Sequence, residues 1–245
     1  MFIDISLQTA LYGVAIITAA YFVRGVTGFG SAVISIPLLL LIGLPINVVV
    51  PVVVLLDYVG SAMQGLKNRR AIAWRQVWPT LPFMAVGVAT ALYIFHATDA
   101  TALTKAMAVF IIVFALYQLL SAQPRESQAM LWAVPAGGLG GFVGTLFGTG
   151  GPFYVAYLQL RGLDKSAFRA TFATLYLIDG ANRLFGYLAI GLLNQQVLNY
   201  SMVFLPAMAL SLYAGGHLHV KINPAMFKRA ISILLVASGA MLLLR

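Results

Sequence analysis

The chain has 245 residues, of which 61% are hydrophobic and 9% are charged, and its mean hydropathy is +0.94. A soluble domain carries about 25% charged residues because its surface must hold water, so this composition excludes a soluble enzyme as well as a disordered chain. The net charge of +9 comes from basic residues scattered through short loops, a pattern typical of membrane topology signals rather than of a nucleic-acid surface. The sequence contains no cysteine, which excludes disulfides and thiolate metal sites.

Ten apolar segments follow one another along the chain. They cover residues 6–23, 26–43, 46–66, 77–95, 103–120, 130–145, 147–160, 167–190, 197–216 and 225–244. A helix needs about 20 apolar residues to cross the hydrocarbon core, and the alternation of a transmembrane β-strand is absent from these segments. The sequence therefore predicts an all-α polytopic membrane protein. Because the first 23 residues carry no Lys or Arg, we expect the first segment to be kept as a span rather than removed as a signal peptide.

Short motifs recur in the same order in the two halves of the chain. The motif GFGS at residues 28–31 is followed about 120 positions later by GTGG at residues 148–151, and LPFMA in the first half is matched by LPAMA in the second. This order predicts two transmembrane repeats, residues 1–122 and 123–245, each with about five hydrophobic helical elements and both within one integral membrane domain. Internal symmetry of this kind is common in secondary transporters.

Basic residues set the predicted orientation of the two repeats. We place the N-terminus outside and let each glycine-rich segment form either two passes or a re-entrant hairpin. Most Lys and Arg residues then fall on the cytoplasmic side, which satisfies the positive-inside rule, while Lys105 and Arg245 lie outside and Arg183 lies within a span. Each half then holds an odd number of elements, so the second repeat is predicted to be inverted relative to the first.

Two glycine clusters interrupt the apolar segments at corresponding places, at residues 28–31 and 148–152. Glycine adopts backbone conformations that a helix excludes, and proline at a first helical position starts a new helix. Free amides at such a break, with the positive end of the following half-helix, can bind an anion. We interpret both clusters as functional helix breaks that face each other. The glycines of residues 137–144 also form a small-xxx-small ladder, for which helix packing is the favoured interpretation and a functional break the alternative.

Polar residues inside predicted spans are the second signal, and they include Asp57, Asp179, Asn182 and Arg183. A charge at the bilayer centre costs about 2.5–3.5 kcal/mol on insertion scales, so such a group faces a partner or a polar cavity. Asp179 and Arg183 are four residues apart and can pair on one helix face, or Arg183 can bind an anion. Asp57 can carry a coupling proton or pair with an arginine. The sequence alone leaves both interpretations open for Arg183 and for Asp57.

With these residues in view, the chain resembles the sulfite exporter TauE/SafE family of anion transporters. The likeness rests on GFGS at residues 28–31 with Pro37 behind it, Gly43-Leu44-Pro45, Asn68-Arg69-Arg70, residues 144–152, and Asn182 with Gly186. It covers nearly the whole chain, and the order of the motifs across both halves carries it. The resemblance implies a secondary transporter for sulfite, sulfonates and related small organic anions.

We therefore expect a secondary transporter, an exporter, of a small organic or inorganic anion such as sulfite or a sulfonate. It would work by alternating access in the cell (inner) membrane, with proton coupling as an option; a passive anion channel on the same scaffold is the alternative. The predicted substrate-binding residues are Arg24, Thr27, Gly28, Gly30, Ser31, Gly148, Thr149, Gly150, Gly151, Asn182 and Arg183, with Asp57 for coupling.

The remaining expectations concern chemistry and partners. We expect no enzymatic activity, since no predicted span holds a His or Cys that could act as a nucleophile, base or metal ligand. We likewise expect no cofactor, no metal and no nucleic-acid partner. The expected partners are the small anion and the lipid bilayer, and a homodimer is left open.

Overall fold

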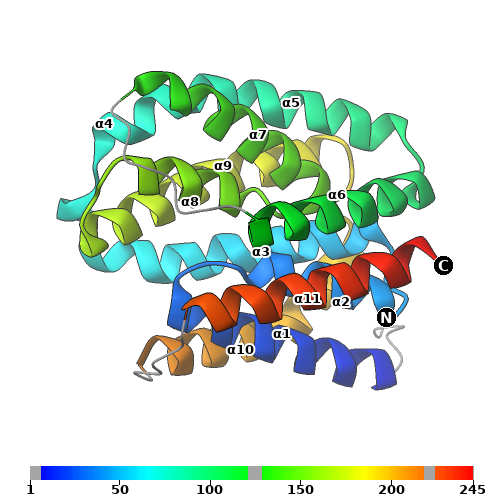
Figure 1. The fold of residues 1–245 in the computed structure, drawn as a ribbon. Helices are drawn as coiled ribbons and strands as arrows, with labels where there is room; N and C mark the ends of the chain where they lie inside the picture. Colours follow the sequence, from blue (N-terminus) through cyan, green and yellow to red (C-terminus); the bar gives the residue numbers. More distant parts are fainter. Residues whose placement is uncertain (1–6, 121–128, 218–223, 245) are drawn as a thin grey trace. The chain divides into compact units, whose positions relative to one another are not determined.

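The computed structural model describes residues 7–120, 129–217 and 224–244. Within these ranges every regular element is helical (Figure 1). The elements are α1 (Leu7–Thr27), α2 (Ser31–Leu41), α3 (Ile46–Gly65), η1 (Leu66–Ala71), α4 (Trp74–Val77), η2 (Trp78–Thr80), α5 (Leu81–Ala97), α6 (Ala100–Leu120), η3 (Met130–Trp132), α7 (Ala133–Phe147), α8 (Gly151–Leu160), α9 (Lys165–Ala189), α10 (Gln195–His217) and α11 (Pro224–Leu243). Each of the ten predicted segments corresponds to one helix of ten or more residues.

Six helical stretches of the described chain are long and apolar enough to cross a membrane. They are Leu7–Thr27, Ile46–Met63, Trp74–Ala97, Ala100–Tyr117, Met130–Phe147 and Gln195–His217. At 1.5 Å of rise per residue, 18 to 24 residues span about 27–36 Å, which matches a hydrocarbon core of about 30 Å. The prediction of an all-α polytopic membrane protein is confirmed.

The two helices that follow the glycine clusters are much shorter. α2 has 11 residues and α8 has 10, so each is only about 15–17 Å long, roughly half of the hydrocarbon thickness. Neither helix alone can cross the bilayer. The glycine-rich segments therefore contain half-length helices, as expected for broken rather than continuous spans.

The helices group into two compact units that do not coincide with the halves of the sequence. The first comprises Met1–Val53, Thr98–Ala122 and Asn194–Arg245, and the second Val54–Ala97 and Gln123–Leu193. Each unit therefore combines elements from both predicted repeats. The repeat boundary at 122/123 lies outside the described residues, and the division into repeats stays a prediction.

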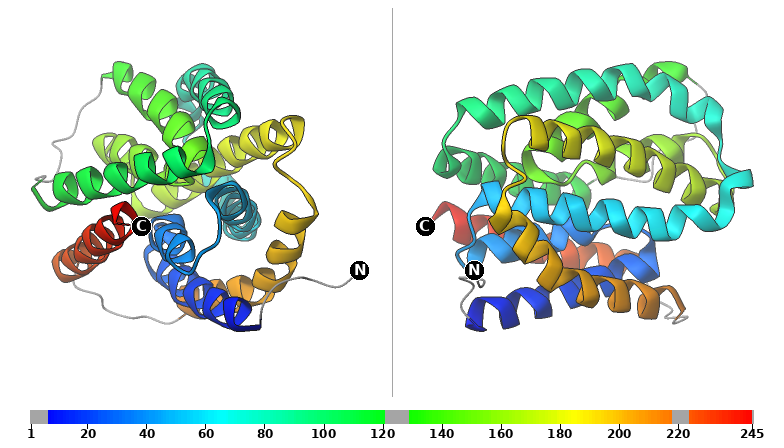
Figure 2. Two further views of the ribbon diagram at one scale, coloured as in Figure 1. Left: turned by 90° about the vertical axis from the view of Figure 1, so that its right-hand side faces the viewer. Right: turned by 180° about the vertical axis from the view of Figure 1, so that it is seen from behind.

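Long helix pairs form the centre of each unit. In the first, α1 lies along α10, and α6 lies along α11 (dark blue with orange, and green with red, in Figure 1). In the second, α5 lies along α7, as the views of Figure 2 also show. Both units thus join a helix of one sequence half to a helix of the other half.

Glycines set the close approach of these pairs. A Cβ at Gly25 would lie 2.6 Å from the Leu212 carbonyl oxygen of α10, and a Cβ at Gly141 would lie 2.6 Å from the Met84 carbonyl oxygen of α5. A Cβ at Gly137 would overlap the carbonyl oxygen of Thr80. Small residues let helix backbones approach closely in a membrane. The packing interpretation is therefore confirmed for Gly137 and Gly141.

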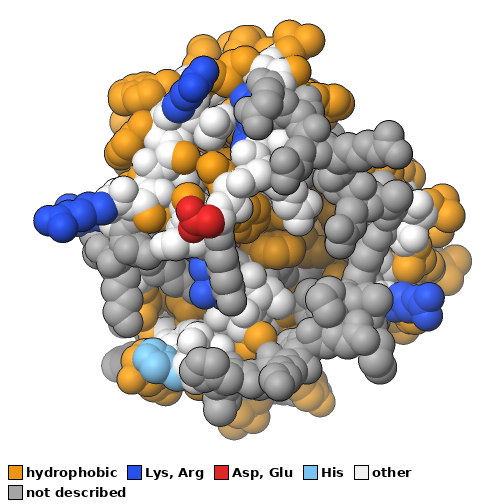
Figure 3. Space-filling view, turned by 60° about the vertical axis from the view of Figure 1, so that its left-hand side comes forward, with side chains coloured by type: hydrophobic (Ala, Val, Ile, Leu, Met, Phe, Trp, Pro, Cys, Tyr) orange, Lys and Arg blue, Asp and Glu red, His pale blue; other side chains and the backbone are white. Residues whose placement is uncertain are grey.

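The described basic side chains on one face of the molecule do not form a single patch. On the face that Figure 3 shows, the Lys and Arg side chains drawn in blue stand apart, with apolar and white surface between them. Trp74 and Trp78 are exposed, and their ring centroids are 5.9 Å apart. Aromatic residues of this kind are enriched at membrane–water interfaces.

Candidate functional site

The second glycine cluster reverses the chain between α7 and α8. Gly148 has a φ of +68°, and its N–H donates to the Gly144 carbonyl at 2.9 Å, which ends α7 in a left-handed C-cap. Gly150 precedes α8, which begins at Gly151 and has Pro152 in its first turn. The sequence thus produces the predicted break, with a glycine stop and a proline start.

A buried arginine from α9 lies against this break. The Arg183 side chain is only 2% exposed, and its Nη2 donates to the carbonyl oxygen of Gly140 at 3.3 Å. The same nitrogen is ion-paired with Asp179 Oδ2, one helical turn earlier. Of the two interpretations that the sequence left open, the structure forms the intrahelical pair and also brings Arg183 to the glycine break.

Two glycines make room for the guanidinium. A Cβ at Gly150 would lie 2.6 Å from Arg183 Nη2, and a Cβ at Gly144 would overlap the guanidinium group itself. The ladder of residues 137–144 therefore has two faces. Gly137 and Gly141 pack on α5, whereas Gly144 accommodates the charged group. α7 is continuous through these residues, so the break itself lies at Gly148, after the ladder.

Three tyrosines belong to the same cluster as the arginine. The Tyr176 ring centroid is 5.7 Å from Arg183 Cζ, within cation–π range. Tyr154 of α8 stands edge-on to Tyr176 at 6.5 Å between centroids, and a Cβ at Gly140 would lie 2.9 Å from the Tyr154 hydroxyl oxygen. The Tyr187 hydroxyl donates to the Thr145 carbonyl. Tyr154 and Arg183 therefore meet at the backbone of Gly140.

Several polar atoms of this cluster are buried without a hydrogen-bond partner. They are Thr149 Oγ1, Tyr154 Oη, Asp179 Oδ1 and Arg183 Nε. All four side chains are at least 98% buried. An unsatisfied buried polar group costs about 1–3 kcal/mol, and native proteins avoid it in the great majority of cases. The described part of this cluster therefore holds buried donors and an acceptor that its own side chains do not satisfy.

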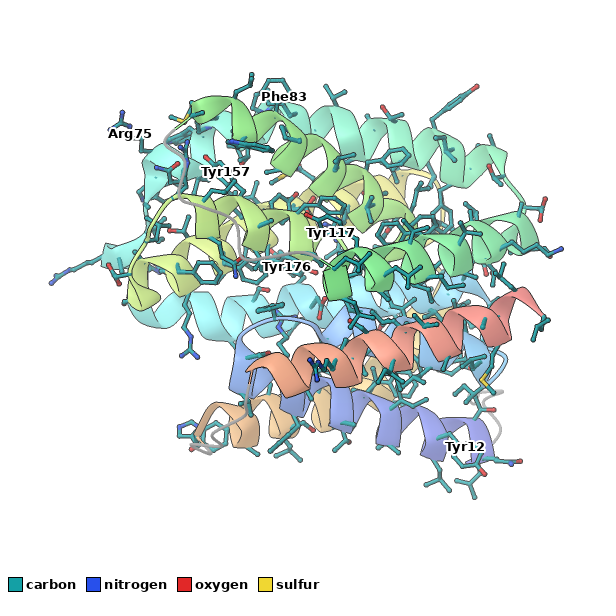
Figure 4. All side chains as sticks on the ribbon, in the orientation of Figure 1. Tyr12, Arg75, Phe83, Tyr117, Tyr157 and Tyr176 are labelled. Carbon is teal, nitrogen blue, oxygen red and sulfur yellow. The ribbon has the colours of Figure 1, made fainter. Side chains whose placement is uncertain are left out.

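Asp57 reaches the same cluster through a tyrosine. It lies on α3, is 3% exposed, and its Oδ2 accepts a hydrogen bond from the Tyr176 hydroxyl at 3.4 Å. Tyr176, labelled in Figure 4, thus contacts Asp57 with its hydroxyl and Arg183 with its ring. Asn182 has a different surrounding: its Nδ2 lies 3.8 Å from Met84 Sδ of α5, and its residue is exposed. The structure does not bring Asn182 into the cluster.

The first glycine cluster belongs to the other compact unit. Gly28 and Gly30 have φ of +92° and +99°, and α2 begins at Ser31. Arg24, 2% exposed, donates from Nη1 to Ser31 Oγ at 3.4 Å, and the Thr27 hydroxyl donates to the Phe29 carbonyl at 2.7 Å. The cluster again combines a break, a half-helix start and a buried arginine. The predicted residues of the first break are thus adjacent in space as well as in sequence.

Sequence reasoning missed part of the second cluster. Tyr154 and Tyr176 are not among the predicted residues, and Gly140 and Gly144 belong to the ladder for which packing is the favoured interpretation. The signal that could have indicated the tyrosines is their hydroxyl, since a tyrosine in a span carries a polar group that needs a partner. The described residues hold no group of three or more His, Cys, Asp or Glu side chains placed to bind a metal ion.

The family comparison covers both breaks. The chain matches the sequence model of one family, described as sulfite exporter TauE/SafE, over residues 13–242. It is 28% identical over 189 residues to the "Probable inner membrane transporter protein TsaS" of Comamonas testosteroni, which covers 76% of this chain and 79% of that protein. No solved structure matches the chain.

Proposed function

Because the chain belongs to the sulfite exporter TauE/SafE family, we propose that it is a secondary transporter that exports a small organic or inorganic anion, such as sulfite or a sulfonate, by alternating access. It is a multi-pass transporter of the inner membrane. The observation that carries the proposed substrate class is the buried Arg183 at the second glycine break, surrounded by buried polar atoms without a partner.

Electrostatics favours an anion at this position. A cation inside a span is costly and marks a substrate or ion pathway in most membrane proteins. The N-terminus of α8 adds the positive end of a helix dipole beside it, and Thr149 and Tyr154 add neutral hydroxyl donors. In this proposal, Gly148, Thr149, Gly150 and Gly151 with Arg183 bind the anion in the second unit. Arg24, Thr27, Gly28, Gly30 and Ser31 form the corresponding cluster of the first unit.

The packing inside each unit supports the proposed repeat. In the order of the sequence motifs, α7 corresponds to α1 and α10 corresponds to α5. The structure packs α1 along α10 in one unit and α7 along α5 in the other. A two-fold repeat produces such equivalent pairs, so the observation favours two inverted copies over an accidental likeness of motifs.

Proton coupling belongs to this proposal, with Asp57 as part of the proton pathway. Its carboxylate is buried and accepts a hydrogen bond from Tyr176, whose ring lies against the binding arginine. A buried carboxylate next to the substrate site is the usual means of linking proton and substrate movement in transporters. The proposal includes no enzymatic activity and no cofactor.

Transport by purified protein in proteoliposomes tests the proposal. We expect saturable uptake of sulfite or methanesulfonate that empty liposomes lack, and accumulation above the equilibrium level when a proton gradient is imposed. A passive channel would carry the anion only down its electrochemical gradient. The absence of transport for every anion of the panel would contradict the proposed function, and downhill movement alone would favour the channel.

A further inference from the structure

Asp179 is ion-paired with Arg183, one helical turn along α9. We infer that the transported anion displaces Asp179 from Arg183, and that Asp179 takes up one proton as it is displaced. Arg183 thus alternates between its own helix and the substrate, and one proton accompanies each singly charged anion. The inference rests on the proposed function and adds a second residue and a stoichiometry to it.

The geometry provides both partners for this exchange. Arg183 uses Nη2 for Asp179 and for the Gly140 carbonyl, while its Nε has no partner. Asp179 uses Oδ2, while its Oδ1 has no partner. The pair is therefore incompletely satisfied on both sides. An anion at Gly150 arrives next to Arg183 Nη2, the nitrogen that Asp179 occupies, because a Cβ at Gly150 would lie 2.6 Å from that atom. The anion and Asp179 therefore compete for the same nitrogen.

Charge balance in a buried site requires the proton. Asp179 and Arg183 together are neutral, so an anion added beside them would be a buried charge without compensation, which is strongly unfavourable. If the anion takes Arg183 as its counter-ion, the Asp179 carboxylate becomes the uncompensated charge, because it is fully buried. Protonation of that carboxylate removes the charge. The sum of the anion, the proton and the ion pair is then neutral.

Few other charged or titratable groups lie near Asp179. From α9 itself the neighbours are Arg183, Tyr176 and Tyr187. From α8 come Tyr154 and Tyr157, the latter hydrogen-bonded to Gln76. From α3 come Asp57, through Tyr176, and Tyr58, whose ring would lie 3.1 Å from a Cβ at Gly180. α7 contains no titratable residue. The described titratable side chains on the other elements packed against α9, namely η1, α4 and α5, are exposed: Arg69, Arg70, Arg75, Tyr93 and His96. Asp179 is therefore the carboxylate whose charge is tied directly to that of Arg183.

The exchange also defines the substrate class. One arginine and one proton compensate one negative charge, and the neutral hydroxyls of Thr149 and Tyr154 bind oxygen atoms without adding charge. A singly charged oxyanion, such as a sulfonate or hydrogensulfite, fits this balance. A doubly charged oxyanion such as sulfate would leave one buried charge uncompensated. Because the anion and the proton then move together without net charge, the direction of transport depends on the anion gradient and the pH difference. Net export requires an outward anion gradient larger than the opposing proton gradient.

Proton movement in proteoliposomes tests the exchange, with methanesulfonate as the probe, a pH indicator inside and the membrane voltage clamped by potassium and valinomycin. For the unmodified protein we expect one proton per methanesulfonate and a rate independent of voltage. In Asp179→Asn we expect transport without proton movement and with a rate that depends on voltage. Asp164→Asn makes the same chemical change at the exposed N-cap of α9 and should behave as the unmodified protein.

Binding to the purified protein gives a second readout that needs no variant. Weakly buffered protein should take up one proton per methanesulfonate bound, and the affinity should fall about tenfold per pH unit above neutrality, as one linked proton requires. Transport by the unmodified protein without proton uptake would overturn the inference and leave the proposed function intact. The inference would also be overturned if the Asp179→Asn variant still moved one proton per methanesulfonate and the Asp57→Asn variant did not. Failure of every anion in the panel would instead overturn the proposed function.

Discussion

At the first break, Gly28 and Gly30 have positive φ, and a Cβ at either position would meet nothing within 4 Å. At the second break, Gly144 and Gly150 have ordinary helical or near-helical backbone. A Cβ at Gly144 would overlap the Arg183 guanidinium, and a Cβ at Gly150 would overlap the Gly140 carbonyl oxygen and lie 2.6 Å from Arg183 Nη2. Glycine is therefore needed for backbone conformation at Gly28 and Gly30, as it also is at Gly148, whereas at Gly144 and Gly150 it is needed for space. Two motifs that look alike in sequence can therefore require glycine for different physical reasons. Substitutions at these positions can distinguish the two reasons.

The largest effect is expected at the charged pair of the second break. Arg183→Gln should abolish transport and lower the free energy of unfolding by about 3–5 kcal/mol, because Asp179 is left as a buried charge without a partner. The double variant Arg183→Gln with Asp179→Asn should recover most of that stability and none of the transport. Thermal unfolding in detergent and proteoliposome flux measure the two quantities. Recovery of transport in the double variant would show that the arginine is only structural.

The next effect tests the need for space. Gly144→Ala should reduce transport at least a hundredfold while the protein still inserts into the membrane, because the new methyl group occupies the position of the guanidinium. Gly150→Leu should have the same result. Gly138→Ala is the matched control on α7, since a Cβ there lies 4.0 Å from its nearest neighbour, the Phe83 carbonyl oxygen. Equal flux in the Gly144 and Gly138 variants would remove the argument that glycine makes room for Arg183.

At the first break, the effect of a substitution on stability should depend on backbone conformation and not on side-chain size. Gly30→Ala places a Cβ on a residue with φ of +99° and should cost about 1–2 kcal/mol of stability. Gly30→Asn should cost less, because asparagine tolerates left-handed backbone better than alanine does, although it is larger. Gly30→Leu should abolish transport with insertion intact. Chemical denaturation in mixed micelles would rank the variants, and a ranking by side-chain volume would contradict the comparison.

The smallest effect concerns two tyrosine hydroxyls. Tyr154→Phe removes a buried hydroxyl without a partner, so we expect a loss of roughly fivefold to tenfold in anion affinity with no loss of stability. Tyr187→Phe removes a hydroxyl that donates to the Thr145 carbonyl, so we expect a loss of about 1 kcal/mol of stability with unchanged affinity. Titration calorimetry and thermal unfolding distinguish them. The reverse pattern would show that Tyr187, and not Tyr154, binds the anion.

Local signals in the sequence were enough to predict the helices and both helix breaks. Apolar segment length indicates the spans, and the pair Gly148 and Pro152 indicates where α7 ends and α8 begins. Charge spacing along one helix indicates that Asp179 can reach Arg183. Each of these features depends on residues close together in the chain, and the family resemblance drawn from their order is confirmed.

Features that depend on distant residues were not predictable in this way. Arg183 reaches the Gly140 carbonyl across 43 positions, and Tyr176 reaches Asp57 across 119. No spacing in one sequence records such contacts. For the same reason the ladder of residues 137–144 could not be divided into a face for α5 and a face for the arginine. The compact units, each built from both halves of the chain, likewise follow from packing between helices far apart in sequence.

A crystal structure of the protein soaked with selenite, located by the anomalous scattering of selenium, tests the central claim most directly. We predict a selenium peak at the N-terminus of α8 with oxygen atoms within hydrogen-bond distance of Arg183 and Thr149, and with Asp179 no longer bonded to the guanidinium. A bound anion away from Arg183, with the Asp179 pair unchanged, would contradict the account.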